Sequence, residues 1–143
     1  MSGQRIGGAR FGENGMASAF VAVVAASLLL IGGFAVDMGR AIAEQRVAAD
    51  EAEQAARAGS GQISVQGLRD GQVLLNDGSA TSSALSFMSM SGHPGSVSVQ
   101  DGVVTTRVTI AMPTSILGMI GIKTITVSAT ASSSNLFGVT RSA

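Results

Sequence analysis

Residues able to do chemistry are few in this sequence, and their spacing forms no metal site. His93 is the only histidine, and cysteine is absent. A metal site needs several convergent ligands, which one histidine in a Gly-His-Pro-Gly loop does not supply. We therefore expect His93 to be a solvent-exposed turn residue.

Catalytic and phosphate-binding patterns are also missing. Serine is abundant, but no Gly-x-Ser-x-Gly elbow presents one as a nucleophile. Gly59–Gly61 and Gly118–Gly121 are not phosphate loops, because in neither segment is the last glycine directly followed by the Lys-Ser/Thr pair that binds phosphate and Mg²⁺. The sequence thus predicts a protein that is not an enzyme, with no cofactor, no metal and no small-molecule substrate.

Asp37 is the acidic residue with the least obvious role. It directly follows an apolar stretch and precedes Arg40. Charges near membrane depth tend to be partnered. Two interpretations follow: Asp37 marks the point where lipid ends, or it pairs with an arginine of a partner subunit.

The apolar stretch Met16–Val36 has no charge, no proline and no Asn or Gln. Its 21 residues form a helix of roughly 30 Å at about 1.5 Å per residue, the thickness of a bilayer hydrocarbon core. A secretory h-region is shorter and ends in a small-x-small cleavage site, whereas Asp37 and Arg40 follow here. We predict a retained transmembrane helix; a cleaved signal or a buried soluble helix are the alternatives.

Charge on the two flanks predicts the orientation. Residues 1–15, expected to be a flexible tail, carry Arg5 and Arg10 against Glu13, whereas residues 37–53 carry more acidic than basic residues. By the positive-inside rule the tail is cytoplasmic and the larger part of the chain lies outside. The expected location is therefore the cytoplasmic (inner) membrane, in a single pass.

The segment 37–58 looks like the same helix continuing into water. It is rich in alanine, and Arg40/Glu44, Arg46/Asp50 and Glu53/Arg57 are opposite charges four residues apart. Small residues form a stripe suited to close helix packing, and Ser18, Ala22 and Ala26 form a small-xxx-small face within the membrane stretch. The residues assigned to helix packing are Ala22, Ala26, Asp37, Arg40, Ala48, Ala52 and Ala55.

Residues 59–143 are expected to form a small extracytoplasmic head. Gly59–Gly61 ends the helix, and the following elements are read from alternation and turn signals. Expected strands are Gln62–Val65, Gln72–Asn76, Ser96–Gln100, Val103–Met112 and Ile122–Ser132, with helices at Asp77–Ser91, capped by Asp77, and at Thr114–Ile120, started by Pro113. Asp101-Gly102 is a hairpin turn, and Asn135–Ala143 is a tail.

The order from Gln72 onward is β-α-β-β-α-β. The predicted class is α+β: a long N-terminal helix followed by a head with an antiparallel sheet. Only 5 aromatic residues are present, all Phe, so Met88, Met90, Met112 and Met119 are expected to fill its core. A head of this size has a marginal core and needs support from the long helix or from partner subunits.

Composition excludes further classes. Nine basic and nine acidic residues give a formal net charge of zero, so no basic surplus indicates nucleic acid. The lack of cysteine excludes a disulfide framework. The expected partners are proteins and the membrane.

Three segments carry a family resemblance: Gly15–Val21, then Ala35–Ala41, then Gln45–Gly59. They resemble the TadE/TadG-like proteins of the Tad (Flp) pilus system, particularly the actinobacterial type. The element Val-Asp-x-Gly-Arg followed by an Ala-rich helix carries most weight. The segments Pro113–Gly118 and Ile125–Ala129 look like the end of such heads.

The resemblance implies a minor pilin, pseudopilin or pilus-assembly component, anchored in the membrane or incorporated in a surface pilus, with other pilin or assembly subunits as partners. TadE-type members are cut after a glycine by a prepilin peptidase, with Glu five residues on. Gly15 and Met16 would be the matching cleavage site, but Phe20 stands at the fifth position. This departure favours a TadG-like, uncut member.

Three functional hypotheses remain open from the residues. The first is a structural subunit of a type IV-related pilus that works through helix packing and protein–protein contacts. The second is a membrane-anchored binding module or secretion-machinery component whose head recognises a ligand or partner. The third is a secreted soluble protein with a cleaved signal, whose mature chain starts near Asp37 or later.

Overall fold

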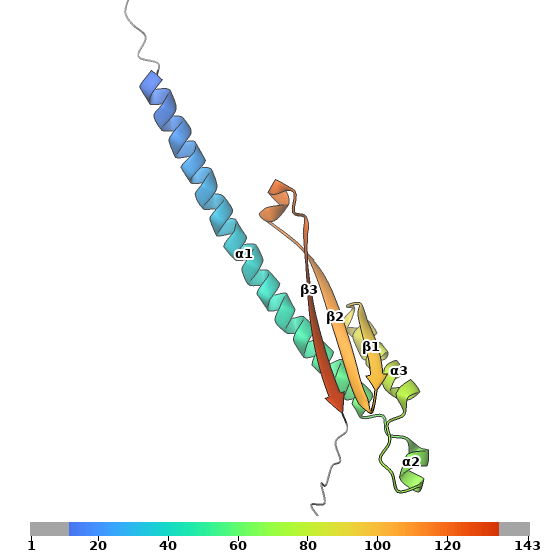
Figure 1. Ribbon diagram of the computed structural model, residues 1–143. Helices are drawn as coiled ribbons and strands as arrows, with labels where there is room; N and C mark the ends of the chain where they lie inside the picture. Colours follow the sequence, from blue (N-terminus) through green and yellow to red (C-terminus); the bar gives the residue numbers. More distant parts are fainter. Residues whose placement is uncertain (1–11, 135–143) are drawn as a thin grey trace, which may run out of the picture.

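A single long helix is the largest element of the molecule, and the head packs against it. The computed structural model describes residues 12–134, and in it helix α1 runs without interruption over Gly12–Ser60. At about 1.5 Å per residue this helix is roughly 70 Å long. Figure 1 shows most of the remaining elements near its C-terminal half, while the turn between the last two strands reaches alongside the N-terminal half, whose first turns extend beyond it.

The head contains a three-stranded antiparallel sheet. Its strands are β1 (Gly95–Gln100), β2 (Val103–Pro113) and β3 (Thr124–Ser134), in the order β1-β2-β3. The register places Val99 opposite Val104 and Val108 opposite Ala129. The α+β class and the antiparallel sheet predicted from the sequence are confirmed.

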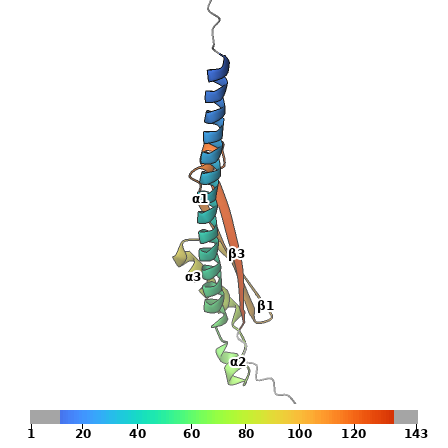
Figure 2. The same cartoon turned by 90° about the vertical axis from the view of Figure 1, so that its left-hand side faces the viewer.

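One face of the sheet is covered by helices. Helix α1 packs along β2 and β3, and α3 (Asp77–Ser91) packs against α1 and β1. Figures 1 and 2 show both helices beside the strands. Strand β2 alternates accordingly: every second residue from Val104 to Met112 is buried, and the residues between them face away from the helices.

The core uses alanines of α1 against larger side chains of the head. Its buried residues are Ala48, Ala52, Ala55, Met88, Val108 and Ile110 in one cluster, and Ala80, Ala84 and Val104 in a second. Residues of the long helix are thus part of the core of the head, which explains how so small a head is stable. The core of the described residues also departs from the predicted list, because Met90 and Met119 are exposed.

Two polar bonds fix the head to the helix. The hydroxyl of Thr106, fully buried on β2, donates to the carbonyl oxygen of Ala52 at 2.6 Å. At the end of α1, the hydroxyls of Ser60 and Ser133 lie 2.9 Å apart. Because a buried hydroxyl without a partner is costly, these bonds also fix the register between α1 and the sheet.

The segment between α1 and α3 differs from the prediction. The expected strands Gln62–Val65 and Gln72–Asn76 meet in a single bridge, Ile63 with Leu75, and the chain between them forms the short helix α2 (Val65–Arg69). The side chain of Ser64 caps this helix by accepting from the Gly67 N–H at 3.2 Å. The alternation of apolar and polar residues in the two expected strands is short, and the capping bond of Ser64 favours a helix locally instead.

The remaining boundaries agree more closely. Helix α3 spans the predicted residues, but its cap is Asn76, whose Oδ1 accepts from the Ser79 N–H at 3.0 Å, and not Asp77. The hairpin turn is confirmed, with positive φ at both Asp101 (50°) and Gly102 (75°). Pro113 ends β2 instead of starting a helix, and a single 3-10 turn, η1 (Leu117–Ile120), follows.

Helix α1 begins earlier than predicted. Residues Gly12–Gly15 already belong to it, where the sequence suggested a tail up to residue 15. The expected tails at 1–11 and 135–143 lie outside the described residues.

Replacing Ala52 by leucine tests the packing of α1 on the sheet. Ala52 is fully buried, so Ala52→Leu overpacks the contact and is expected to lower the free energy of unfolding by about 1–3 kcal/mol. Ala49→Leu, the same change at an exposed position of the same helix, is the control and should leave stability unchanged. Denaturation of the detergent-solubilised chain, followed by circular dichroism, measures both; equal stability of the two variants would contradict this packing.

Candidate functional site at the junction of helix α1 and the β2–β3 connection

The most distinctive polar arrangement in the described residues surrounds Asp37. Its side chain is fully buried although it belongs to an otherwise exposed part of α1. The connection between β2 and β3, which includes η1, covers it. This connection folds back along α1 toward its N-terminal half (Figure 1).

Three backbone amides bind the Asp37 carboxylate. The N–H of Ser115 donates to Oδ1 at 3.0 Å, and those of Ile116 and Leu117 donate to Oδ2 at 3.0 Å and 2.9 Å. These amides precede or begin η1, where a helical turn leaves its first N–H groups without partners. Asp37 therefore acts as a cap supplied from a distant part of the chain.

Arg40 adds a second bond at the same junction. Its Nη1 donates to the hydroxyl of Ser115 at 2.9 Å. Arg40 had been paired with Glu44 on sequence spacing, but its hydrogen bond goes to Ser115. The Asp-x-x-Arg spacing thus places both side chains, three residues apart on one helical face, against the same loop.

Gly33 lets the loop approach the helix. It lies one turn before Asp37 and is buried under the side chain of Ile116. A Cβ at this position would meet Cγ2 of Ile116 at 2.1 Å, which is far inside van der Waals contact. A larger residue at position 33 would therefore push the loop away from Asp37.

The same three N–H donors shift the titration of Asp37. They hold the pKa of its carboxyl below the ordinary value of 3.8, with the bond from Leu117 having the largest effect. Burial opposes this shift by disfavouring the charged form, and the positive charge of Arg40 contributes a smaller lowering. The carboxylate is accordingly charged at neutral pH, the state that the three donors require.

These contacts give Asp37 partners that the sequence-based interpretations did not include, because its carboxylate binds amides of its own chain. That Asp37 marks the end of the lipid or pairs with an arginine of a partner subunit stays a prediction. The sequence contained a signal for this contact: Gly33, Asp37 and Ala41 are spaced by four residues on one face of α1, and all three are buried.

The other predicted packing residues fall into two groups. Ala48, Ala52 and Ala55 are fully buried against the head of their own chain. Ala22 and Ala26 are exposed, and Ala26 lies beside Ile116, Met119 and Ile120. The cleavage candidates Gly15 and Met16 lie within helix α1, and nothing in their geometry tests cleavage.

His93 is not the free turn residue that the sequence suggested. Its Nδ1 lies 2.8 Å from Oε2 of Glu51 on α1, and its side chain is 31% exposed. The bond ties the loop between α3 and β1 to the long helix. His93 thus has a structural partner rather than a metal, and residues 12–134 hold no group of three or more metal-ligating side chains.

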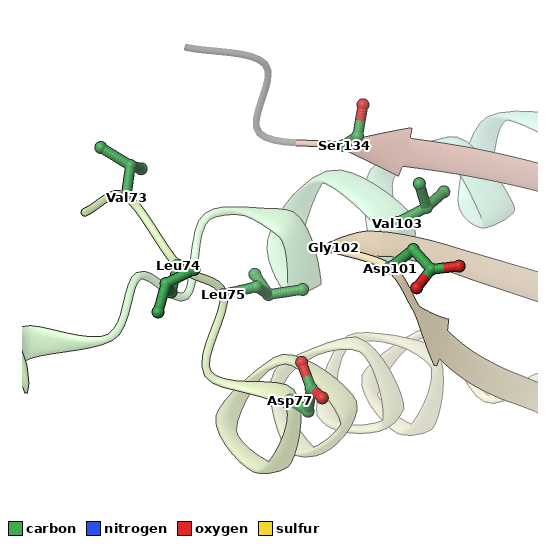
Figure 3. A pocket seen from close by; sticks show the side chains of 8 residues that line it. All are labelled: Val73, Leu74, Leu75, Asp77, Asp101, Gly102, Val103 and Ser134. Atoms are coloured by element: carbon green, nitrogen blue, oxygen red, sulfur yellow. The ribbon is translucent and has the colours of Figure 1, made fainter. Parts of the chain in front are cut away.

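A depression at the opposite end of the head offers no catalytic set. It is lined by Val73, Leu74, Leu75, Asp77, Asp101, Gly102, Val103 and Ser134. Figure 3 shows its two carboxylates on separate elements, Asp77 at the start of α3 and Asp101 in the β1–β2 turn. No histidine or basic residue lines the depression, so it lacks the partners of an acid–base or nucleophilic site.

The fold therefore combines one long helix, apolar and exposed in its N-terminal half, with a head fastened to its C-terminal half. Among residues 12–134, α1 is the one helix long and apolar enough to cross a membrane, and 6% of its most apolar window is buried. The core helix of a soluble protein would be mostly buried; this window has the length and composition of a membrane anchor.

Comparison with protein families gives a match over the N-terminal part of the chain. Residues 15–65 match the family described as Flp pilus-assembly TadE/G-like, which confirms the resemblance seen in the sequence. The match covers the apolar stretch and the Val-Asp-x-Gly-Arg element, and it indicates a pilus-related structural role. No curated protein and no solved structure matches the chain.

Removing the charge of Asp37 should release the loop. In Asp37→Asn the carboxamide keeps one acceptor oxygen for three N–H donors and adds an NH₂ that repels them. We expect faster hydrogen exchange at the amides of Ser115, Ile116 and Leu117. Asp50→Asn, an exposed aspartate of the same helix, should leave these rates unchanged; protection retained in Asp37→Asn would show that the carboxylate does not hold the loop.

The lowered pKa of Asp37 also predicts a pH dependence. A carboxyl with a depressed pKa stabilises the fold above its ordinary value and loses that contribution as the pH falls through the folded-state pKa. The difference in free energy of unfolding between the wild type and Asp37→Asn should be constant at neutral pH and shrink below about pH 4. Denaturation at a series of pH values measures this difference; a gap that persists unchanged in acid would exclude Asp37 as its source.

Proposed function

We propose that this protein is a structural, non-enzymatic subunit of a Tad (Flp) pilus system, either a minor pilin or a pilus-assembly component. The observation that carries the proposal is the division of α1 into two halves. The C-terminal half is covered by the head, whereas the apolar N-terminal half has almost no cover within the chain. An exposed apolar helix needs lipid or neighbouring helices around it.

Both surroundings fit a pilus subunit. In the membrane, Met16–Val36 would cross the bilayer once, with the N-terminus in the cytoplasm and the head outside. In a filament, the same surface would pack against the helices of other subunits. The exposed small residues Ala22 and Ala26 suit such packing, because they allow the backbones of two helices to approach closely.

A second candidate function has its own supporting observation. The distal end of the head exposes a group of apolar side chains: Val65, Leu68, Val73 and Leu74. Exposed apolar patches often mark interaction surfaces. A membrane-anchored binding module would use this end to recognise an envelope partner while its helix stays in the bilayer.

Location in the cell separates the two candidates. Filaments are sheared from cells, and the sheared fraction and the membranes are both probed for the chain. A pilin is expected in the filaments. Two results together would contradict a role in the pilus and favour the binding module: the chain is found only in membranes, and cells that lack the chain still make normal filaments.

The packing role of the small face is tested in the same experiment. Ala22→Leu combined with Ala26→Leu should leave membrane insertion intact but remove the chain from the filaments. Ala17→Leu with Ala35→Leu is the control, because at about 100° per residue these positions lie on the opposite face of α1. Normal incorporation of the first variant would contradict helix packing through Ala22 and Ala26.

A further inference from the structure

The connection between β2 and β3 presents apolar side chains that the head does not cover. Met119 is 82% exposed, Ile120 57% and Ile122 47%. From Thr114 to Ile122 the sequence contains no charged residue, and Lys123 follows at the base of the connection. An exposed apolar tip on so small a head is unfavourable in water.

The exposed tip of the connection, formed by Met119, Ile120 and Ile122, lies beside the apolar stretch of α1. Ile116 lies over Gly33, and Met119 and Ile120 line a groove with Ala26, Leu29 and Leu30. All these positions of α1 lie within the apolar stretch Met16–Val36. At about 1.5 Å per residue, Ala26 is roughly 15 Å before Val36, about half the thickness of a hydrocarbon core.

The backbone of the connection is also suited to a low-dielectric environment. The N–H groups of Ser115, Ile116 and Leu117 donate to Asp37, and those of Thr114, Met119, Gly121 and Ile122 donate to carbonyl oxygens within the connection. The hydroxyl of Thr114 donates to the carbonyl oxygen of Ile122. Backbone that enters lipid must pair its polar groups, and these seven N–H groups meet that requirement.

We propose that the connection Thr114–Ile122 is a second membrane-contacting element, which enters the head-side leaflet of the bilayer beside α1. Met119, Ile120 and Ile122 then contact acyl chains, while Lys123 and Arg40 lie near the lipid headgroups. The bond network of Asp37 sits at the lipid boundary and closes the backbone of the inserted turn. The head is thereby held against the membrane at two points rather than one.

Lipid fits this surface better than the alternative occupant, the helix of a second copy. The apolar side chains of the tip and of Leu29 and Leu30 continue one uncharged surface at the same level of α1. The two occupants differ in whether acyl chains reach Met119.

Tryptophan fluorescence distinguishes them, because the chain contains no tryptophan. Three single-tryptophan variants of the full chain are reconstituted in phosphatidylcholine vesicles with or without brominated acyl chains: Met119→Trp, Phe20→Trp in the membrane stretch, and Val65→Trp at the distal end. We expect several-fold quenching by brominated lipid and a blue-shifted emission for Met119→Trp and Phe20→Trp. Val65→Trp should show neither effect.

Quenching of Phe20→Trp without quenching of Met119→Trp would overturn the proposal while leaving the membrane anchor intact. Loss of quenching in both would overturn the anchor and the proposal together. Protected amides at Ser115–Leu117 in Met119→Trp verify that the connection is still docked. Ile120→Trp, measured in the same way, replaces Met119→Trp if that protection is lost.

Discussion

The bond between the Asp37 carboxylate and three amides of the β2–β3 connection is the contact on which the geometry of this molecule depends. It joins the end of the apolar stretch to the far end of the sheet, across some 80 residues of sequence. Hydrogen bonds to a charged carboxylate are stronger than bonds to a neutral acceptor, so a neutral side chain would bind these three N–H donors more weakly. The charge at the end of the apolar stretch is therefore a requirement of the loop that it binds.

Small residues make the remaining contacts between helix and head. Gly33, Ala41, Ala48, Ala52, Ala55, Ala56 and Gly59 follow one face of α1, and all are buried. Because these residues keep the helix thin on this side, the sheet approaches it closely and Thr106 reaches the helical backbone. The head and the C-terminal half of α1 are consequently one packed unit.

This construction suits a subunit whose role is structural. The family match to Flp pilus-assembly TadE/G-like proteins over residues 15–65 covers the apolar stretch and the Asp37 element. The polar outer face of the sheet and the apolar distal end remain open for contacts with other proteins. The described residues thus comprise an exposed apolar helix segment, a loop docked on Asp37 and a head with open surfaces.

Local sequence patterns determined much of this architecture. The apolar run, the alanine-rich extension, helix 77–91 and the Asp101-Gly102 hairpin were predictable because each depends on composition or on neighbouring residues. The partners of Asp37 and His93, the burial of the alanine stripe by the chain's own head, and the replacement of two expected strands by α2 were decided only by the tertiary structure. These features depend on residues separated by tens of positions, whose meeting is set by how the sheet packs on α1. The spacing of small residues marks a packing face of α1, but it does not show which segment of the chain covers that face.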